Sequence, residues 1–295
     1  MTTVAVLYSC RADEGLIDPV VKALVDEGMT VFKVEAGKQS VGEGIGAVIA
    51  PCDRGEIVKA ALDCFHNNVP IVHVDAGEAE LESSTRDVLN RWLLTRMASL
   101  IFTNTEEGRQ AVIRSGEEPW RVHSVGYTFL DGIELKSKGE IMEKYGLPED
   151  YDIVIYNPDV YSVERTRKDM DKIFDMLDKF TIILKPNSDT NDFIVNEYIE
   201  NHYYIGKLGN KFDTRDEFLS ALKYCKRFMG NSSVILHESP YFNVECIHVG
   251  ERNRGRKPRL IKPEELGASE RIAKTIKDTL DNKSREELLR KKVLL

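Results

Sequence analysis

The sequence predicts an α/β protein with two Rossmann-like domains, each built on a parallel β-sheet that helices cover on both faces. Short apolar runs of strand length alternate with amphipathic helical stretches along almost the whole chain, which is typical of βαβ units. The chain has 295 residues, of which 42% are hydrophobic, enough for two medium-sized cores. We expect an N-terminal domain at residues 1–135, a C-terminal domain at 136–262 and additional helices at 263–295.

The first half contains the predicted strands in short apolar runs, because both faces of a parallel sheet are buried. These runs are residues 4–8, 47–50, 70–74, 100–102 and 122–125. The predicted helices between them are residues 15–27, 55–67, 85–98 and 106–115. A connecting segment at 131–150 follows, with a short helix at 139–145.

The same alternation returns in the second half. Its predicted strands are residues 153–156, 181–184, 227–229 and 245–249, and its predicted helices are residues 164–179, 192–201, 215–224 and 234–242. The remaining tail is helical, and Ser284 and Glu287 have the spacing of a capping box for the last helix.

Composition excludes several classes of protein. A net charge of −8 argues against a protein whose main role is to bind nucleic acid or an anionic membrane. No apolar run approaches the roughly 18 residues of a membrane span, so we expect a soluble, cytoplasmic protein with no membrane insertion. The five cysteines are scattered and form no CxxC pair, so we expect neither a disulfide framework nor a zinc site, and no metal or cofactor.

A candidate phosphate site lies at residues 229–240, which read as the end of a strand, a turn of small residues and the start of a helix. Free backbone N–H groups after Ser232 and Ser233 would bind phosphate, and Glu238 would lie within reach of a ribose. Arg252, Arg254 and Arg256 would bring guanidinium groups to the same region. The alternative is a serine helix cap followed by a solvated basic loop; the combination favours a nucleotide or sugar-phosphate site.

Polar residues also follow nearly every predicted strand, and ligands of open α/β sheets bind where the strands end. Any one of these residues could instead be a helix cap. Together they predict a cleft between the two domains. They are Arg11, Asp13, Glu14, Asp53, Arg54, His73, Asp75, Glu78, residues 157–159, Lys185, Asn187, Asp189 and residues 231–233.

Several of these segments form an ordered series from residue 8 to residue 256. The series comprises Tyr-Ser-Cys-Arg-Ala-Asp-Glu-Gly at 8–15, Cys-Asp-Arg-Gly-Glu at 52–56, His-Val-Asp-Ala-Gly-Glu at 73–78, Asp87 four residues before Arg91, Lys-Pro-Asn-Ser-Asp at 185–189, Gly-Asn-Ser-Ser at 230–233 with Glu238, and Gly-Glu-Arg-Asn-Arg-Gly-Arg at 250–256. The series resembles the motifs of the UDP-N-acetylglucosamine 2-epimerase family, nearer its hydrolysing, N-acetylmannosamine-forming branch.

The resemblance implies the two-domain glycosyltransferase-B fold, with an N-terminal domain reduced between Val34 and Gly46, and a homodimer. It also implies catalytic roles for Asp53, Asp75 and Asp87, which would surround the sugar. The residues that it assigns to binding of the UDP-sugar substrate are Arg11, His73, Arg91, Asn157, Lys185, Asn187, Asn231, Ser232, Ser233, Glu238, Arg252 and Arg256.

The chemistry of the family is an anti elimination of UDP through a 2-acetamidoglucal intermediate, followed by addition of UDP or water. Carboxylates suit this reaction because the proton at C2 of the sugar must be removed as UDP departs. Two of the differences from the family pattern remove a histidine: Asn157 replaces a histidine that precedes proline, and Trp92 follows Arg91 where histidine is usual. Two alternatives remain: a glycosyltransferase of the same fold, and a nucleotide-sugar-binding protein without catalysis.

Overall fold

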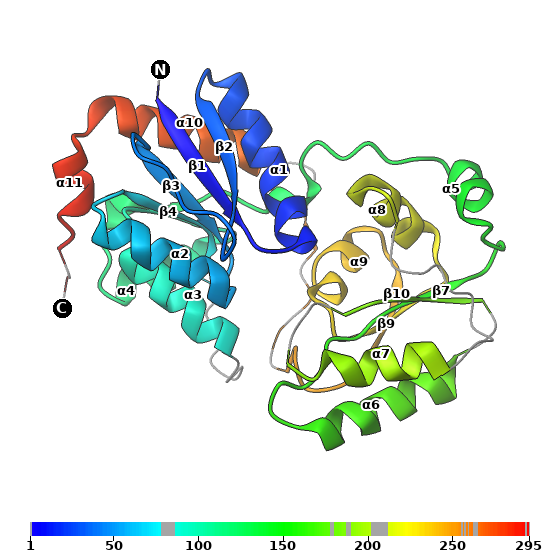
Figure 1. Cartoon of the computed structure of the whole chain (residues 1–295). Helices are drawn as coiled ribbons and strands as arrows, with labels where there is room; N and C mark the ends of the chain where they lie inside the picture. The colour runs from blue at the N-terminus through cyan, green and yellow to red at the C-terminus, as the bar shows by residue number, and fades with distance from the viewer. Residues whose placement is uncertain are drawn as a thin grey trace. The chain divides into compact units, whose positions relative to one another are not determined.

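The computed structural model describes residues 2–77, 86–177, 180–186, 190–201, 212–254, 256, 258, 260–261, 265–292 and 294. Two compact units divide the chain: Met1–Gly132 together with Lys262–Leu295, and Ile133–Ile261. Each unit has one parallel sheet between helices, as the alternation of strands and helices predicts (Figure 1). Each predicted strand is present to within one or two residues at its ends.

The sheet of the first unit has the strand order β2-β1-β3-β4-β5-β6, and its pairs are all parallel. Its strands are β1 (Thr3–Tyr8), β2 (Thr30–Glu35), β3 (Ala47–Pro51), β4 (Ile71–Ala76), β5 (Leu100–Thr103) and β6 (Val122–Ser124). Successive side chains of a strand face opposite sides, so Val4 and Val6 enter one core and Ala5 and Leu7 the other.

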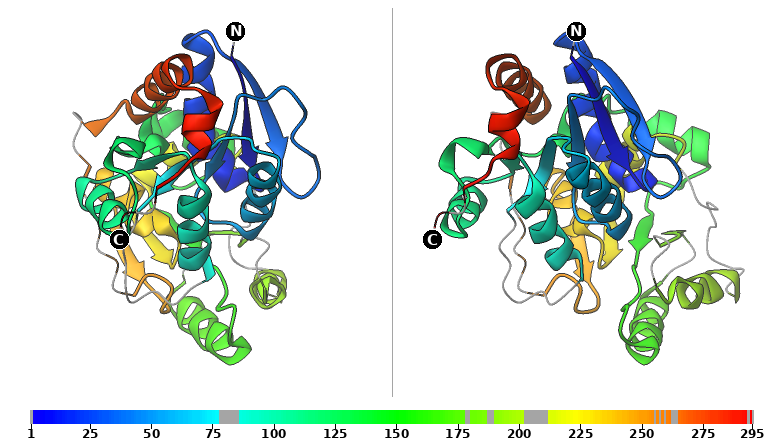
Figure 2. Two further views of the ribbon diagram at one scale, coloured as in Figure 1. Left: turned by 90° about the vertical axis from the view of Figure 1, so that its left-hand side faces the viewer. Right: turned by 60° about the vertical axis from the view of Figure 1, so that its left-hand side comes forward.

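Helices cover both faces of this sheet. On one face lie α1 (Arg11–Asp26) and α10 (Ala268–Asn282); on the other lie α2 (Gly55–His66), α3 (Arg86–Met97) and α4 (Glu106–Arg114). Ile272 and Ile276 of α10 are fully buried in the same core as Val4 and Ile17. Helix α10 lies beside α1 (Figures 1 and 2). The short α11 (Arg285–Leu289) follows. Residues near both ends of the sequence therefore build one core.

The edge strand β2 was not among the predicted apolar runs. Its residues are mostly half-buried or exposed, so its sequence lacks the continuous apolar run of a central strand. Eleven residues, 36–46, connect β2 to β3 without a helix, and Ala36 and Ile45 of this segment are buried in the core beneath α2. A compact loop thus takes the place that a crossover helix commonly fills.

The second unit has a sheet of order β10-β9-β7-β8, again parallel. Its strands are β7 (Asp152–Ile155), β8 (Thr181–Leu184), β9 (Arg227–Gly230) and β10 (Glu245–His248). Its helices are α5 (Lys138–Tyr145), α6 (Val163–Met176), α7 (Asp192–Asn201), α8 (Arg215–Tyr224) and α9 (Glu238–Tyr241). Buried side chains of α6 and α7 pack on one face, and those of α5 and α8 on the other.

The prediction of one helix over residues 234–242 is wrong. A 3-10 turn, η3 (Ser233–Ile235), is followed by the separate four-residue helix α9. Pro240 explains the break, because a proline inside a continuous helix would lack an N–H donor and clash with the carbonyl four residues earlier. The restart at Glu238 puts Pro240 in the first turn of α9, where proline is tolerated.

Candidate active site

Three carboxylates of the first unit gather at the carboxyl ends of adjacent strands. Strands β1, β3 and β4 are neighbours in the sheet, and Asp13, Asp53 and Asp75 lie at or just after their ends. The buried thiol of Cys52 lies among them. Burial raises its pKa well above the ordinary value, and the negative charges of Asp75, Asp53 and Asp13 raise it further. The fold therefore brings together two of the three predicted catalytic aspartates.

The backbone at this edge is strained at two positions. Cys52 has φ of 57° and Asp75 has φ of 66°, in the left-handed region that non-glycine residues rarely occupy. A register shift between Val74 and Ala76 accompanies the second. Such conformations cost on the order of 1–3 kcal/mol each and concentrate at functional sites. The two strained residues, Cys52 at the end of β3 and Asp75 at the end of β4, are consistent with a functional site at this edge of the sheet.

Arg91 brings helix α3 to this cluster. Its guanidinium donates to a carboxylate oxygen of Asp53, and both side chains are largely buried, with 12% and 17% exposure. Asp87 lies in the first turn of α3, four residues before Arg91, so the two residues share a face of the helix. The third predicted aspartate thus belongs to the same region of the first unit as Asp53.

Asn104 is a residue of this site that sequence reasoning missed. It follows β5, is 7% exposed and donates from its side-chain amide to Asp75. Asp13, which the sequence placed only among the polar strand ends, accepts hydrogen bonds from the backbone N–H and hydroxyl of Ser9 at 2.8 and 2.7 Å. The position of Asn104 directly after a strand is the same signal that identified Asp53 and Asp75.

His73 is fully buried, and both of its ring nitrogens contact other protein groups. Nε2 lies 2.9 Å from the carbonyl oxygen of Cys52, and Nδ1 lies 3.1 Å from the hydroxyl of Thr95. Burial lowers the pKa of His73 to about 3, so the ring is neutral near pH 7. The carbonyl of Cys52 can only accept, so Nε2 carries the proton of the neutral ring. His73 therefore holds the backbone that precedes Asp53.

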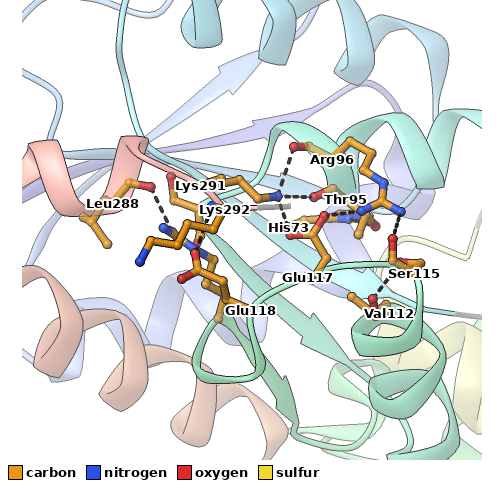
Figure 3. Close-up of polar contacts among 12 residues, drawn as sticks. His73, Thr95, Arg96, Val112, Ser115, Glu117, Glu118, Leu288, Lys291 and Lys292 are labelled. Atoms are coloured by element: carbon orange, nitrogen blue, oxygen red, sulfur yellow. Dashed lines mark hydrogen bonds and ion pairs between the residues drawn. The ribbon is translucent and has the colours of Figure 1, made fainter. Parts of the chain in front are cut away.

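The far end of α3 is held by Lys291, as Figure 3 shows. Its Nζ donates to the backbone carbonyls of Thr95 and Arg96 at 3.2 and 3.0 Å and pairs with Glu117 at 2.6 Å. Arg96 donates to the other oxygen of Glu117 at 2.8 Å. A cation near the last carbonyls of a helix is favourable. The segment after α11 thus fixes the helix that carries Asp87 and Arg91.

In the second unit, Asn231 joins the ends of β9 and β7. Its side-chain oxygen accepts from the backbone N–H of Asn157, and its side-chain amide donates to the carbonyl of the same residue, both at 2.7 Å. Asn231 is 2% exposed. Its carboxamide therefore acts as a backbone clamp on Asn157.

Ser232 and Ser233 follow this clamp. Ser232 is half-buried and Ser233 is exposed, and among the described residues their backbone N–H groups have no hydrogen-bond acceptor. Glu238, at the start of α9 and 7% exposed, pairs with Arg215 at 3.2 Å. Sequence reasoning missed Arg215; the available signal was an arginine in the first turn of a helix, where the helix dipole disfavours a cation.

The remaining predicted binding residues have the following places. Arg252 and Arg256 are half-buried in the loop after β10, and Lys185 follows β8 and is exposed. Asn187, Glu78 and Asp189 lie outside the described residues, as does the side chain of Arg11.

Within the described ranges, His, Cys, Asp and Glu side chains form no group of three suited to a metal ion. Nor does that part of the chain contain a helix long and apolar enough to cross a bilayer.

The sequence pattern of UDP-N-acetylglucosamine 2-epimerases matches residues 35–293. This chain belongs to that family. It is 30% identical over 220 residues to polysialic acid biosynthesis protein P7 of Escherichia coli, covering 71% of this chain and 56% of that protein. Identity to the GDP/UDP-N,N'-diacetylbacillosamine 2-epimerase (hydrolyzing) of Campylobacter jejuni is 29% over 218 residues, covering 69% and 56%. The matches thus span about half the length of these relatives.

Solved epimerase structures share the fold. The Methanocaldococcus jannaschii UDP-GlcNAc 2-epimerase, in complex with UDP-GlcNAc and UDP, superposes with a TM-score of 0.69 at 16% identity, covering 99% of this chain and 95% of that one. The Neisseria meningitidis UDP-GlcNAc 2-epimerase bound to UDP-GlcNAc gives 0.67 at 13% identity, covering 98% and 94%. The predicted fold, two Rossmann-like domains of the glycosyltransferase-B type, is confirmed.

Proposed function

We propose that the protein is an enzyme that acts on UDP-GlcNAc or a related UDP-amino sugar. In the proposed reaction the C2–H and C1–O bonds of the sugar break in anti geometry, UDP leaves and a 2-acetamidoglucal forms. The observation that carries this proposal is the gathering of Asp53 and Asp75 around Cys52 on adjacent strand ends. Membership of the epimerase family supports the same reaction.

The proposed acid and base roles belong to Asp53, Asp75 and Asp87. A carboxylate can accept the C2 proton, and its conjugate acid can return a proton when the intermediate is attacked. Arg91 holds Asp53 and Asn104 holds Asp75, so these two carboxylates have a fixed orientation before substrate binds. Such preorganisation is what an efficient proton transfer requires.

The UDP moiety is assigned to the second unit. Ser232 and Ser233 would bind the diphosphate through their N–H groups, and Glu238, fixed by Arg215, would bind the ribose. Arg11 and Arg252 would stabilise charge on the departing diphosphate. Further substrate contacts are proposed for Arg91, Asn157, Lys185, Asn187 and Arg256.

Two predicted binding residues receive a different proposed role. His73 and Asn231 are 0% and 2% exposed, and both side chains are engaged with the backbone of neighbouring loops. We assign them to positioning Asp53 and Asn157 rather than to contact with the sugar nucleotide.

In the proposed second step, water adds to the 2-acetamidoglucal. The products would then be the UDP released in the first step and a free amino sugar epimeric at C2. Relatives from Campylobacter jejuni and Legionella pneumophila are named hydrolyzing epimerases of diacetylbacillosamine nucleotides. We propose that a product of this class serves biosynthesis of a cell-surface polysaccharide; the Escherichia coli relative is named as a polysialic acid biosynthesis protein. The expected homodimer and cytoplasmic location stay predictions.

The test is incubation with UDP-GlcNAc in deuterated water, with UDP and sugar products followed by NMR. UDP release with deuterium at C2 supports the proposal. Sugar transfer that occurs only in the presence of an added acceptor would support a glycosyltransferase. Thermal stabilisation by UDP without turnover would support a binding protein.

Two variants test the proposed catalytic carboxylates: Asp53→Asn and Asp75→Asn should each lower the rate about 100-fold. Asp63→Asn, an exposed carboxylate on α2, is the matched control and should leave the rate unchanged.

A further inference from the structure

Asn253, a residue of the loop after β10, is buried against the loop that contains Ser232 and Ser233. It is 3% exposed, and its side-chain amide donates to the carbonyls of Asn231 at 2.9 Å and Ser232 at 3.3 Å. Its side-chain oxygen accepts from Nη1 of Arg256 at 3.1 Å. A guanidinium can only donate and a carbonyl can only accept, so these partners fix which way the carboxamide points.

This contact determines where the neighbouring N–H groups point. All the described peptide bonds are trans, and in a trans peptide the C=O of one residue and the N–H of the next lie on opposite sides. The carbonyls of Asn231 and Ser232 turn toward Asn253. The N–H groups of Ser232 and Ser233 therefore turn away from it, to a side where the described chain offers them no acceptor.

The loop is held from its other end as well. Asn231, whose carbonyl Asn253 binds, clamps the backbone of Asn157 with its own side chain. The two carboxamides together prevent rotation of the peptides on either side of Ser232. Donors that are fixed before binding lose less conformational entropy when they bind an anion.

We propose that Asn253 is a positioning residue for the diphosphate of the nucleotide: it never touches the ligand, and it orients the N–H groups of Ser232 and Ser233 that do. The inference rests on the proposed function, in which those N–H groups bind UDP. Arg256 contributes by holding Asn253 in the orientation that donates to the two carbonyls.

The test compares the affinities for UDP and uridine, measured by ligand-observed NMR titration on the full chain. Asn253→Leu keeps the size of the side chain and removes the donor. Loss of the donor should weaken UDP binding about tenfold and leave uridine binding unchanged. Asn253→Ser, which can still donate to one carbonyl, should show a smaller loss. The matched control is Asn282→Leu, because Asn282 also donates to a backbone carbonyl, that of Asp278 at 2.7 Å, in the other unit.

The outcomes distinguish failure of the positioning role of Asn253 from failure of the proposed function. A reduced ratio of UDP to uridine affinity in the Asn253 variants, with an unchanged ratio in the control, supports the positioning role. A lower melting temperature with an unchanged ratio would overturn it, because that is the result of a purely structural role. If the wild-type protein does not bind UDP, the proposed function fails first, and the inference fails with it.

Discussion

Acid should destabilise the first unit through His73, and the structure gives the size of the effect. Burial lowers the pKa of this histidine from 6.5 to about 3 in the folded protein. Between these two values the unfolded chain binds a proton that the folded chain does not, so the free energy of unfolding falls as the pH falls. Each pH unit below 6.5 costs about 1.4 kcal/mol, which makes about 2 kcal/mol at pH 5.

Urea unfolding between pH 5 and pH 7.5 measures this loss. Both tryptophans, Trp92 and Trp120, lie in the first unit, so their fluorescence reports on the unit that contains His73. His73→Gln cannot titrate in this range, while a glutamine can still donate and accept hydrogen bonds. The stability difference between wild type and His73→Gln should therefore shrink by about 2 kcal/mol on acidification from pH 7.5 to pH 5.

Other groups that titrate are common to the two proteins and cancel in this difference. His123, whose pKa burial also lowers, is one of them. His66→Gln is the control for the substitution itself, because His66 is an exposed histidine at the end of α2. A difference for His73→Gln that stays constant over the whole range would refute a neutral, buried His73.

Three further outcomes are expected. Lys291→Met should lower the free energy of unfolding of the first unit by about 3 kcal/mol in urea, because Glu117 loses a buried partner. The double variant Lys291→Met with Glu117→Gln should recover part of this loss. A double variant as unstable as the sum of the two single variants would contradict the pairing. Gly230→Ala should cost about 4 kcal/mol or more in unfolding followed by circular dichroism, since a Cβ atom would clash with the carbonyl oxygen of Ile155. Gly146→Ala, where a Cβ atom would meet nothing within 4 Å, should cost about 1 kcal/mol, and equal losses in the two variants would be inconsistent with the clash. Asn104→Ala should lower kcat about tenfold because Asp75 loses its donor, and an unchanged kcat would exclude that role.

The fold could be predicted because the central strands are buried on both faces and therefore have continuous apolar sequences. The same reasoning fails for β2, an edge strand whose exposed residues, such as Phe32 and Lys33, follow no such pattern. It fails again at residues 234–242, where apolar spacing suggested one helix. Pro240 contained the information needed to break that helix, but its effect depends on where the helix begins.

The candidate site was predictable only in part. Polar residues at strand ends identify Asp53 and Asp75, since every parallel strand ends at the same edge of its sheet. Which strand ends are neighbours depends on the order of the strands in the sheet. Strand β1 lies between β2 and β3, and this order brings Asp13, which follows β1, close to Asp53, which follows β3. The contribution of Asp13 to the cluster therefore follows from tertiary structure alone. Arg215 lies 23 residues from its partner Glu238, a pairing that no local pattern encodes.

The candidate sites of the two units use the same device, in which a buried side chain donates to a carbonyl of a neighbouring loop. His73 donates to the carbonyl of Cys52, the residue before Asp53, just as Asn253 donates to the carbonyls before Ser232 and Ser233. In a trans peptide, fixing a carbonyl also fixes the N–H of the following residue on the opposite side. A polar residue at a motif position can therefore serve a ligand without reaching it. The three residues proposed to position loops, His73, Asn231 and Asn253, are at most 3% exposed, whereas Ser232 and Ser233, proposed to bind the diphosphate, remain accessible.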